Sequence, residues 1–499
     1  MEFEVIIDHA RFEEVEIAPR AIDIMNATRS MGYTTESAIA DIIDNSISAN
    51  AKKISIYFPP SADIIKIIDD GDGMSSDELK NAMRYGCDLN YKREDSDLGR
   101  FGLGLKTASF SQCEVLTVIS KKNGRTNSLR WDPTYIEKNG CGWIALSLQP
   151  EEIFKYSLDT KFDAQHSGTI VIWENLSLML AGESDYSSAL SLKMESVRNH
   201  IRLVFHRFLS GEDGLSKIEI SFNDKVIQPI DPFLKSKSMQ ISDVQKILVP
   251  ELGGNEVSVS IKRYLLPSVS KLSKTELNML CGDSTLARTQ GFYVYRNKRL
   301  LVWGTWFRLA LKTNTSKLSR IQIDIPSSLD KLWSLDVKKS TAKPPEIIRK
   351  NLKSLIHYSQ NTSKNTFIAK SKLELHSKIN HFWERTISSD ESINYQINKA
   401  HPLILEFSDK LSNDQRKVFE RLLFDLEQFI PINQMFLDME DEKTIGFASD
   451  EMECSIRQEI GEILDRDHSK TIIQILKTVE PFARYPELVE EILNQRGIL

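Results

Sequence analysis

The sequence lacks several features that would place it in a specialised class. Its 499 residues include only five cysteines, which lie far apart and form no CxxC pair. A disulfide framework and a cysteine zinc site are therefore not expected, and the cysteine content fits a reducing cytoplasm. The acidic first segment, MEFEVIIDHARFEEVE, has no apolar core of a signal peptide. No apolar run approaches the roughly 18 residues of a membrane helix, so neither a secreted nor a membrane-spanning protein is expected.

The composition is that of an ordinary globular protein, but the charge is distributed unevenly. Hydrophobic residues make up 41% and charged residues 27% of the chain, which allows about two to four domains with large cores. The net charge is −6, yet residues 288–378 hold 19 Lys and Arg against 5 Asp and Glu, whereas residues 406–499 hold 11 against 21. The basic stretch could neutralise nucleic-acid phosphates. Alternatively, its charges lie on solvated faces or pair with the acidic tail.

The order of periodic segments predicts two α/β domains followed by a helical region. Residues 1–20 resemble a short arm, and residues 21–183 alternate helical patterns with short strands. A serine-rich stretch over residues 184–191 resembles a linker at the start of a second α/β block, residues 184–345. Helical periodicity dominates residues 346–499. The segments expected to form strands are residues 54–58, 64–68, 169–173, 218–222, 257–264 and 292–295.

One helical segment, residues 37–49 with the sequence SAIADIIDNSISA, carries polar residues on one face. The apolar face comprises Ile39, Ile42, Ile43 and Ile47, and the polar face comprises Asp41, Asp44, Asn45 and Ser48. Asn45 could hold a hard cation there, and Asp41 could orient a water molecule. The alternative is an ordinary amphipathic helix with a solvated polar face.

Two glycine-rich segments follow this helix. Residues 69–74, DDGDGM, end an expected strand, and Asp69 could accept a hydrogen bond from an exocyclic amine unless the segment is only a turn. Residues 99–106, GRFGLGLK, precede a helical pattern, and glycine amides at a helix N-terminus favour anions. This segment is not a P-loop, because Leu105 separates the last glycine from Lys106.

Taken together, four motifs resemble the ATP site of the GHKL superfamily, which comprises gyrase, the large heat-shock chaperones, histidine kinases and MutL. In order, they are the helix with DxxDN, then DDGDG, then GxxGxGxK, then Ser167-Gly168-Thr169 leading a strand. The sequence is most similar to MORC-type ATPases and related prokaryotic proteins. The resemblance covers about residues 20–345. It implies a Bergerat-type ATP-binding α/β sandwich, an S5-like α/β transducer domain and then a helical C-terminal region.

The resemblance also implies roles for individual residues. Asn45 would coordinate Mg²⁺ on the phosphates of ATP, and Asp69, supported by Thr169, would bind the adenine amino group. Asp41 stands where the family usually has a water-activating glutamate, and its side chain is shorter by about 1.5 Å. The helix therefore sits closer to the γ-phosphate, a second water bridges the gap, or turnover is slow. The other residues implied at the nucleotide are Gly73, Met74, Gly99, Gly102, Gly104 and Lys106.

Further implied elements close the site. Residues 79–98 would form a mobile lid over ATP, and the arm of residues 1–20 would cross to a partner chain. Residues 291–299, GFYVYRNKR, resemble the transducer strand and its turn. Lys339, with Lys338 as the second choice, would reach the γ-phosphate from the transducer domain. The alternative is that both lysines are solvated.

The predicted function is a cytoplasmic Mg-ATP-dependent ATPase that acts as a nucleotide-gated homodimeric clamp. Double-stranded DNA is the predicted partner, in DNA compaction or prokaryotic antiviral defence. The alternative is a regulatory or chaperone-like ATPase switch whose helical region, residues 346–499, binds a protein partner without direct DNA contact. A third possibility is ATP binding without useful turnover.

Overall fold

The structure is a computed structural model, and the chain divides into two units, residues 1–360 and 361–499, which are described separately. The residues that the structure describes are 19–29, 32–59, 62–85, 104–140, 142–157, 160–241, 244–250, 256–282, 284–330, 332–333, 344–346, 348–356, 379–387, 393–432, 434–435, 449–467 and 469–498.

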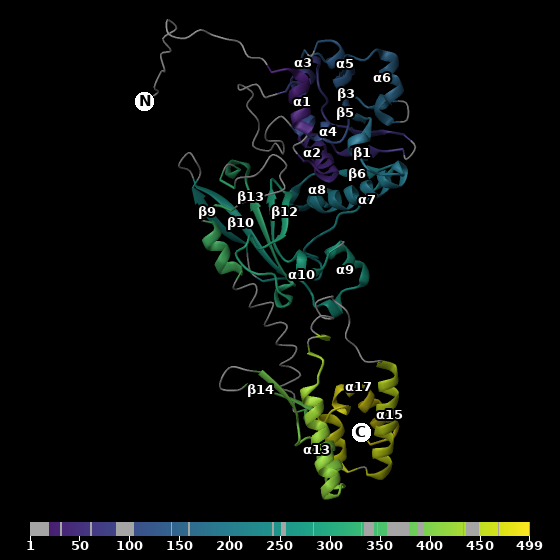
Figure 1. Ribbon diagram of the computed structural model, residues 1–499, viewed down its shortest axis with the longest axis vertical. Helices are drawn as coiled ribbons and strands as arrows, with labels where there is room; N and C mark the ends of the chain where they lie inside the picture. The colour runs from purple at the N-terminus through teal and green to yellow at the C-terminus, as the bar shows by residue number, and fades with distance from the viewer. Residues whose placement is uncertain are drawn as a thin grey trace. The chain divides into compact units, whose positions relative to one another are not determined.

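The first unit begins with a seven-stranded sheet in the order β4-β3-β5-β2-β1-β6-β7 (Figure 1). Neighbouring strands are antiparallel except β1 and β6, which are parallel. The strands are β1 (Lys53–Tyr57), β2 (Ile64–Asp69), β3 (Val115–Lys122), β4 (Arg125–Trp131), β5 (Gly168–Glu174), β6 (Glu219–Phe222) and β7 (Lys225–Val226).

Helices cover both faces of this sheet, because its central strands are apolar on both sides. In β2, Ile65 and Ile67 belong to the main core, whereas Ile68 belongs to a second cluster with Phe162 on the opposite face. The α-helices are α1 (Ala21–Arg29), α2 (Thr35–Ser48), α3 (Ser76–Met83), α4 (Gly104–Phe110), α5 (Pro133–Lys138), α6 (Pro150–Ser157), α7 (Tyr186–Val204) and α8 (His206–Ser210). The 3-10 helices are η1 (Lys161–Ala164), η2 (Leu176–Leu178) and η3 (Glu212–Gly214).

The first sheet continues past the expected domain boundary between residues 183 and 184. The strands β6 and β7 join its edge, and α7 packs its apolar side into the main core. The expected linker at residues 184–191 is wrong, because most of this stretch forms the start of α7. The Asp185 carboxylate accepts hydrogen bonds from the amides of Ser187 and Ser188 and so caps this helix.

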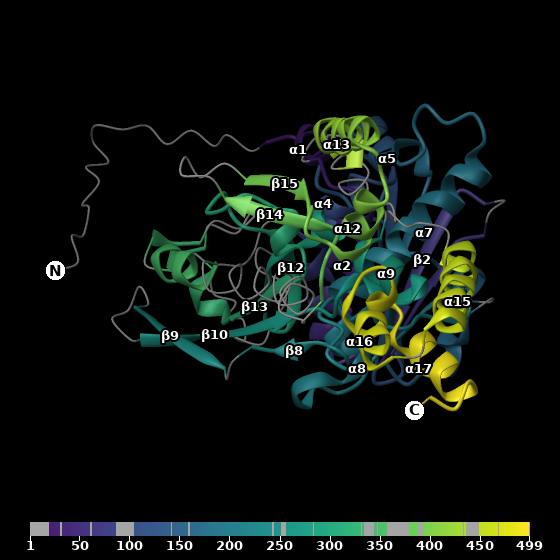
Figure 2. The same ribbon diagram turned by 90° about the horizontal axis from the view of Figure 1, so that it is seen from below.

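A second sheet in the same unit has the order β12-β11-β13-β10-β8, with β9 also pairing with β10 (Figure 2). Its strands are β8 (Met239–Gln240), β9 (Gln245–Pro250), β10 (Glu256–Leu265), β11 (Gly291–Arg296), β12 (Arg299–Thr305) and β13 (Ser319–Ile325). The accompanying helices are α9 (Lys274–Cys281), α10 (Leu286–Thr289), η4 (Val269–Lys271), η5 (Asn314–Ser316) and η6 (Ser327–Leu329). Every residue of β11 is buried, as expected for a central strand that is covered on both faces.

The second unit is mainly helical, as the periodicity predicts, but it also contains an antiparallel hairpin that the sequence did not suggest. Its elements are β14 (Trp383–Ile387), β15 (Ile393–Ile397), α12 (Pro402–Asp409), α13 (Asn413–Gln428), α15 (Ser449–Arg466), α16 (Lys470–Thr478), η7 (Phe482–Arg484) and α17 (Pro486–Gln495). A core cluster joins α15, α16 and α17. The α/β sandwich with a helical C-terminal region is therefore confirmed. Across the described ranges of both units, no helix is long and apolar enough to span a membrane.

Candidate nucleotide site

Helix α2 presents Asp41, Asp44 and Asn45 on adjacent turns. It begins with a capping box in which the side chains of Thr34 and Ser37 each accept a hydrogen bond from the other residue's amide. Asp41 is 5% exposed and Asp44 is fully buried, whereas Asn45 is exposed. The alternative of a solvated polar face is therefore wrong for the two carboxylates. Buried carboxylates require partners, and both have them.

Asp41 is held between Tyr33, just ahead of the helix, and two segments that are distant in sequence. The hydroxyl of Tyr33 donates a hydrogen bond to Asp41 Oδ2 over 3.0 Å. A Cβ atom at Gly104, the first residue of α4, would lie only 3.5 Å from the same oxygen. On the other side, Arg299 Nη2 lies 3.9 Å from Asp41 Oδ1. The carboxylate therefore lies beside the first residue of α4, and its water-activating role stays a prediction.

Asp44 forms a closer ion pair with the same arginine. Arg299 Nε lies 2.8 Å from Asp44 Oδ1, and both side chains are almost completely buried. Asp44 is thus held inside the protein by Arg299, in contrast to the exposed Asn45 next to it.

Asp69 lies at the end of β2 and is bound by three donors. Its Oδ1 accepts hydrogen bonds from the amides of Gly71 (3.0 Å) and Thr169 (3.2 Å), and its Oδ2 accepts one from the Ser46 hydroxyl of α2 (2.8 Å). Burial nevertheless raises the pKa of the carboxyl to about 6, because desolvation outweighs these hydrogen bonds. An ionised carboxylate has about four acceptor positions, so one remains for a further donor.

Thr169 and Met74 are joined to this group through Ser120 of β3. The hydroxyls of Thr169 and Ser120 are 2.9 Å apart, and the Met74 amide donates to Ser120 Oγ over 2.8 Å. The Thr169 side chain therefore fixes the backbone beside Asp69, while its amide binds the carboxylate directly. The sequence predicted support of Asp69 by Thr169, but not the hydroxyl pair.

Gly73 is required by a close backbone approach. It has a φ of +67°, and a Cβ atom there would lie 1.8 Å from the carbonyl oxygen of Lys121. Only glycine fits this conformation and this space. The glycine therefore lets the segment that carries Met74 pack against β3, and its predicted place in the adenine pocket stays a prediction.

Lys106 binds within the domain. Its side chain is 1% exposed, and Nζ donates to the carbonyl of Ala82 over 2.9 Å. Ala82 lies in the last turn of α3, where free carbonyls favour a cation. Whether Lys106 also serves the phosphates stays a prediction. Several predicted parts lie outside the described residues, namely Gly99, Gly102, Lys338, Lys339, residues 86–98 of the lid and residues 1–18 of the arm.

The polar groups of α2 fit a Mg²⁺ ion that is bound mainly by phosphate and water. In the part of the chain that the structure describes, no group of three or more His, Cys, Asp or Glu side chains is placed to hold a metal ion. Asp44 is ion-paired with Arg299, and the exposed carboxamide of Asn45 offers a hard oxygen ligand. Mg²⁺ at nucleotide sites commonly takes only one or two protein ligands, so Asn45 suits this role.

Four residues of the site were missed by the sequence analysis: Tyr33, Ser46, Ser120 and Arg299. Ser46 had a local signal, because it directly follows Asn45 and is a small polar residue that a helix interior seldom favours. Tyr33 directly precedes the cap residue Thr34. Ser120 gave no local signal, and Arg299 ended the segment 291–299 that resembles the transducer strand and its turn. Only the tertiary structure brings these two residues to Asp69 and to α2.

Comparisons with known proteins agree with this geometry. Residues 33–169 match the family of histidine kinase-, DNA gyrase B- and HSP90-like ATPases. The chain is 26% identical over 182 residues to ATPase MORC2A of Mus musculus, which covers 30% of this chain and 18% of that protein. It is 32% identical over 133 residues to ATPase morc-1 of Caenorhabditis elegans, which covers 26% and 15%. The resemblance to GHKL ATPases, and among them to MORC ATPases, is thus confirmed.

These matches cover only part of each protein. The chain spans less than a quarter of the length of these curated relatives. A solved structure described as the N-terminal domain of a DNA repair protein aligns with a TM-score of 0.42 and 11% sequence identity, covering 71% of this chain and 99% of that chain.

Proposed function

We propose that the chain is a Mg-ATP-dependent ATPase. The observation that carries this proposal is that one helix, α2, holds Asp41 beside Gly104, exposes Asn45 one turn further on, and binds Asp69 through Ser46. The base-binding and phosphate-binding ends of the site are therefore fixed relative to each other by a single rigid element. The match of residues 33–169 to GHKL ATPases supports the same reading.

Each residue contributes a defined step. Asp69 would use its remaining acceptor position for the adenine amino group, a contact that a base with a carbonyl in place of that amino group could not make. Asn45 would hold Mg²⁺, which supplies charge neutralisation at the phosphates. Asp41 would orient the attacking water and accept its proton. Because Tyr33 and Arg299 restrain Asp41, the shorter side chain cannot swing freely toward a distant γ-phosphate, and we expect slow turnover.

The test is steady-state ATP hydrolysis by the full chain, with Asn45→Ala as the blank. A wild-type rate above this blank supports the ATPase. A rate equal to the blank at saturating ATP contradicts hydrolysis, and retained ATP binding would then indicate a binding switch.

We further propose that ATP closes two chains into a dimeric clamp, with Lys339, or else Lys338, reaching the γ-phosphate, and that the clamp holds double-stranded DNA. The excess of basic residues over 288–378 supports DNA as the partner. Part of this excess is unavailable, because Arg296, Arg299 and Arg320 are buried. If DNA is bound, its affinity should fall steeply between about 50 and 200 mM salt, and sedimentation should show dimers only with an ATP analogue.

A protein partner is the second candidate, and one feature of the helical unit favours it. Helix α13 exposes large apolar side chains, among them Val418 (71%), Leu422 (54%) and Leu426 (52%). Apolar side chains gathered on one helix are more typical of a protein contact than of DNA binding. Little DNA binding at any salt concentration, with ATP hydrolysis indifferent to DNA, would favour this candidate.

A further inference from the structure

The tip of a hairpin in the second sheet reaches the candidate nucleotide helix. Strands β11 and β12 are joined by a two-residue turn, Asn297 and Lys298, with φ values of +44° and +71°. Positive φ at both positions is typical of a type I′ turn, whose twist matches that of the strands. The turn fixes the first residue of β12, Arg299, at the end of the sheet that faces α2.

Arg299 is buried between the second sheet, to which it belongs, and helix α2, which packs on the first sheet. Its side chain is 6% exposed, and its guanidinium carbon lies 5.6 Å from the ring centroid of Phe205, the residue between α7 and α8. From this position it pairs with Asp44 at 2.8 Å and approaches Asp41 to 3.9 Å. A guanidinium group has donors in a fixed planar fork, so one arginine can restrain two carboxylates one helical turn apart.

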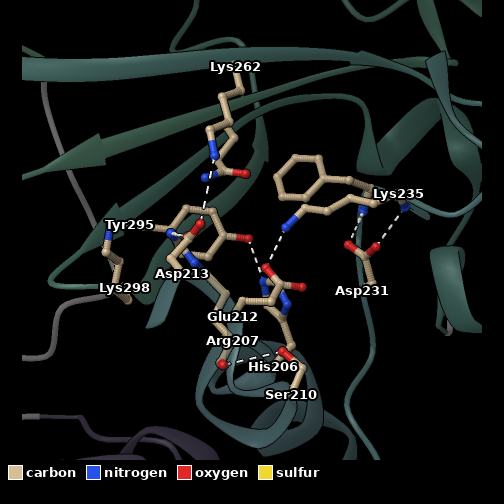
Figure 3. A network of polar contacts seen from close by, with 12 residues as sticks. His206, Arg207, Ser210, Glu212, Asp213, Asp231, Lys235, Lys262, Tyr295 and Lys298 are labelled. Carbon is tan, nitrogen blue, oxygen red and sulfur yellow. Dashed lines mark hydrogen bonds and ion pairs between the residues drawn. The ribbon is translucent and has the colours of Figure 1, made fainter. Parts of the chain in front are cut away.

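A separate network joins the second sheet to helix α8, and none of its residues belongs to α2. Figure 3 shows His206 and Arg207 of α8 beside Tyr295 of β11. His206 Nε2 and the Tyr295 hydroxyl are 2.8 Å apart, and Arg207 forms ion pairs with Asp213 and with Asp324 of β13. This network attaches α8 to the second sheet, and none of its carboxylates belongs to the candidate nucleotide site.

We propose that Arg299 is a positioning residue that couples the second sheet to the water-activating carboxylate. It holds Asp41 and Asp44 in fixed orientations, so that a shift of the β11–β12 hairpin moves Asp41 relative to Gly104 and changes the rate of hydrolysis. The proposal rests on the proposed ATPase function. It predicts an effect on turnover rather than on nucleotide binding, because Arg299 contacts neither Asn45 nor the group around Asp69.

The test compares Arg299→Gln and Arg299→Lys with Arg207→Gln in the full chain. Arg207 is an equally buried arginine at the same boundary, and its loss removes two ion pairs that lie away from α2. We measure kcat for ATP, the Kd for a non-hydrolysable ATP analogue and the thermal midpoint. Arg299→Gln should lower kcat about a hundredfold, as expected for a misplacement of about 1 Å, with the analogue Kd within about twofold. Arg299→Lys should restore part of the loss, and Arg207→Gln should leave kcat nearly unchanged.

The outcomes separate this inference from the function on which it rests. No turnover above the Asn45→Ala blank in the wild-type chain would overturn the ATPase, and the inference with it. An active wild-type chain in which Arg299→Gln matches Arg207→Gln would overturn the inference alone. Equal losses of kcat and analogue affinity in Arg299→Gln would also overturn it, because they would show general damage to α2. If Arg299→Gln does not fold, the kcat of Arg299→Lys decides, since an unchanged value would contradict positioning.

Discussion

The hydroxyl of Ser46 donates a hydrogen bond to Asp69 Oδ2 across 2.8 Å, and both side chains are buried. This bond ties the last turn of α2 to the end of β2. The residue expected to recognise the base is therefore held by the same helix that carries Asp41 and Asn45.

Replacing Ser46 with alanine removes this donor and leaves one side of a buried carboxylate unsatisfied. The expected cost is about 1–3 kcal/mol in the free energy of unfolding. ATP affinity should fall as well, because Asp69 becomes harder to keep ionised. Urea unfolding and calorimetric titration with ATP measure the two effects. Ser191→Ala, which removes an exposed hydroxyl from α7, is the matched control, and equal behaviour of the two variants would contradict the prediction.

Asp69 should make stability depend on pH in a defined direction. Its pKa is about 6 in the folded chain and 3.8 by its ordinary value, so the folded state binds the proton more tightly. The contribution of this group to the free energy of unfolding is therefore greatest below about pH 4 and is lost as the pH rises through about 6, by about 3 kcal/mol. Unfolding in urea between pH 4 and 7, without nucleotide, compares the wild type with Asp69→Asn. A difference between them that does not change with pH would count against the buried carboxylate.

Asp41→Asn should separate hydrolysis from binding. Asparagine has nearly the same shape but cannot accept the proton of the attacking water, so turnover should fall about a hundredfold or more. Affinity for a non-hydrolysable ATP analogue should stay within about twofold. Turnover within tenfold of the wild type would remove Asp41 from the catalytic role, and weakened analogue binding would assign it to the phosphate contacts instead.

Gly73→Ala should destabilise the chain more than Gly124→Ala. Both glycines have similar positive φ values, +67° and +75°, but a Cβ at position 73 meets the Lys121 carbonyl at 1.8 Å, whereas nothing lies within 4 Å of one at position 124. Backbone strain alone should cost about 1–2 kcal/mol at position 124, and the clash should add roughly 2 kcal/mol at position 73. Chemical denaturation of both variants measures the difference. Equal losses would show that the close approach to β3 is not present in solution.

The sequence predicted the elements that depend on local periodicity. The helix expected over residues 37–49 is α2, and the strand expected over 64–68 is β2, each within two residues of the observed bounds. The resemblance to GHKL ATPases assigned Asp41, Asp69 and Gly104 to one site. In the structure Asp41 lies beside Gly104, and Ser46 of the same helix binds Asp69, while their roles at a nucleotide stay predictions.

The rest depends on contacts that no local pattern records. The serine-rich stretch at 184–191 has weak helix propensity, yet it forms the start of α7 because the same helix buries Met194 and Val197 in the core. The burial of Asp44 could not be foreseen, because its partner Arg299 comes from another sheet. Tertiary packing decided both features.

The three contacts of α2 fix the rotation of the helix about its own axis. Asp41 lies beside Gly104, Asp44 pairs with Arg299 and Ser46 binds Asp69, so three neighbours from different parts of the chain each contact a different residue of the helix. Inserting or deleting one residue ahead of Asp41 would rotate all three side chains by about 100° and shift them by about 1.5 Å along the axis. Such a change would break the base-binding, catalytic and inter-sheet contacts in a single step. This segment can therefore vary by substitution but not in length.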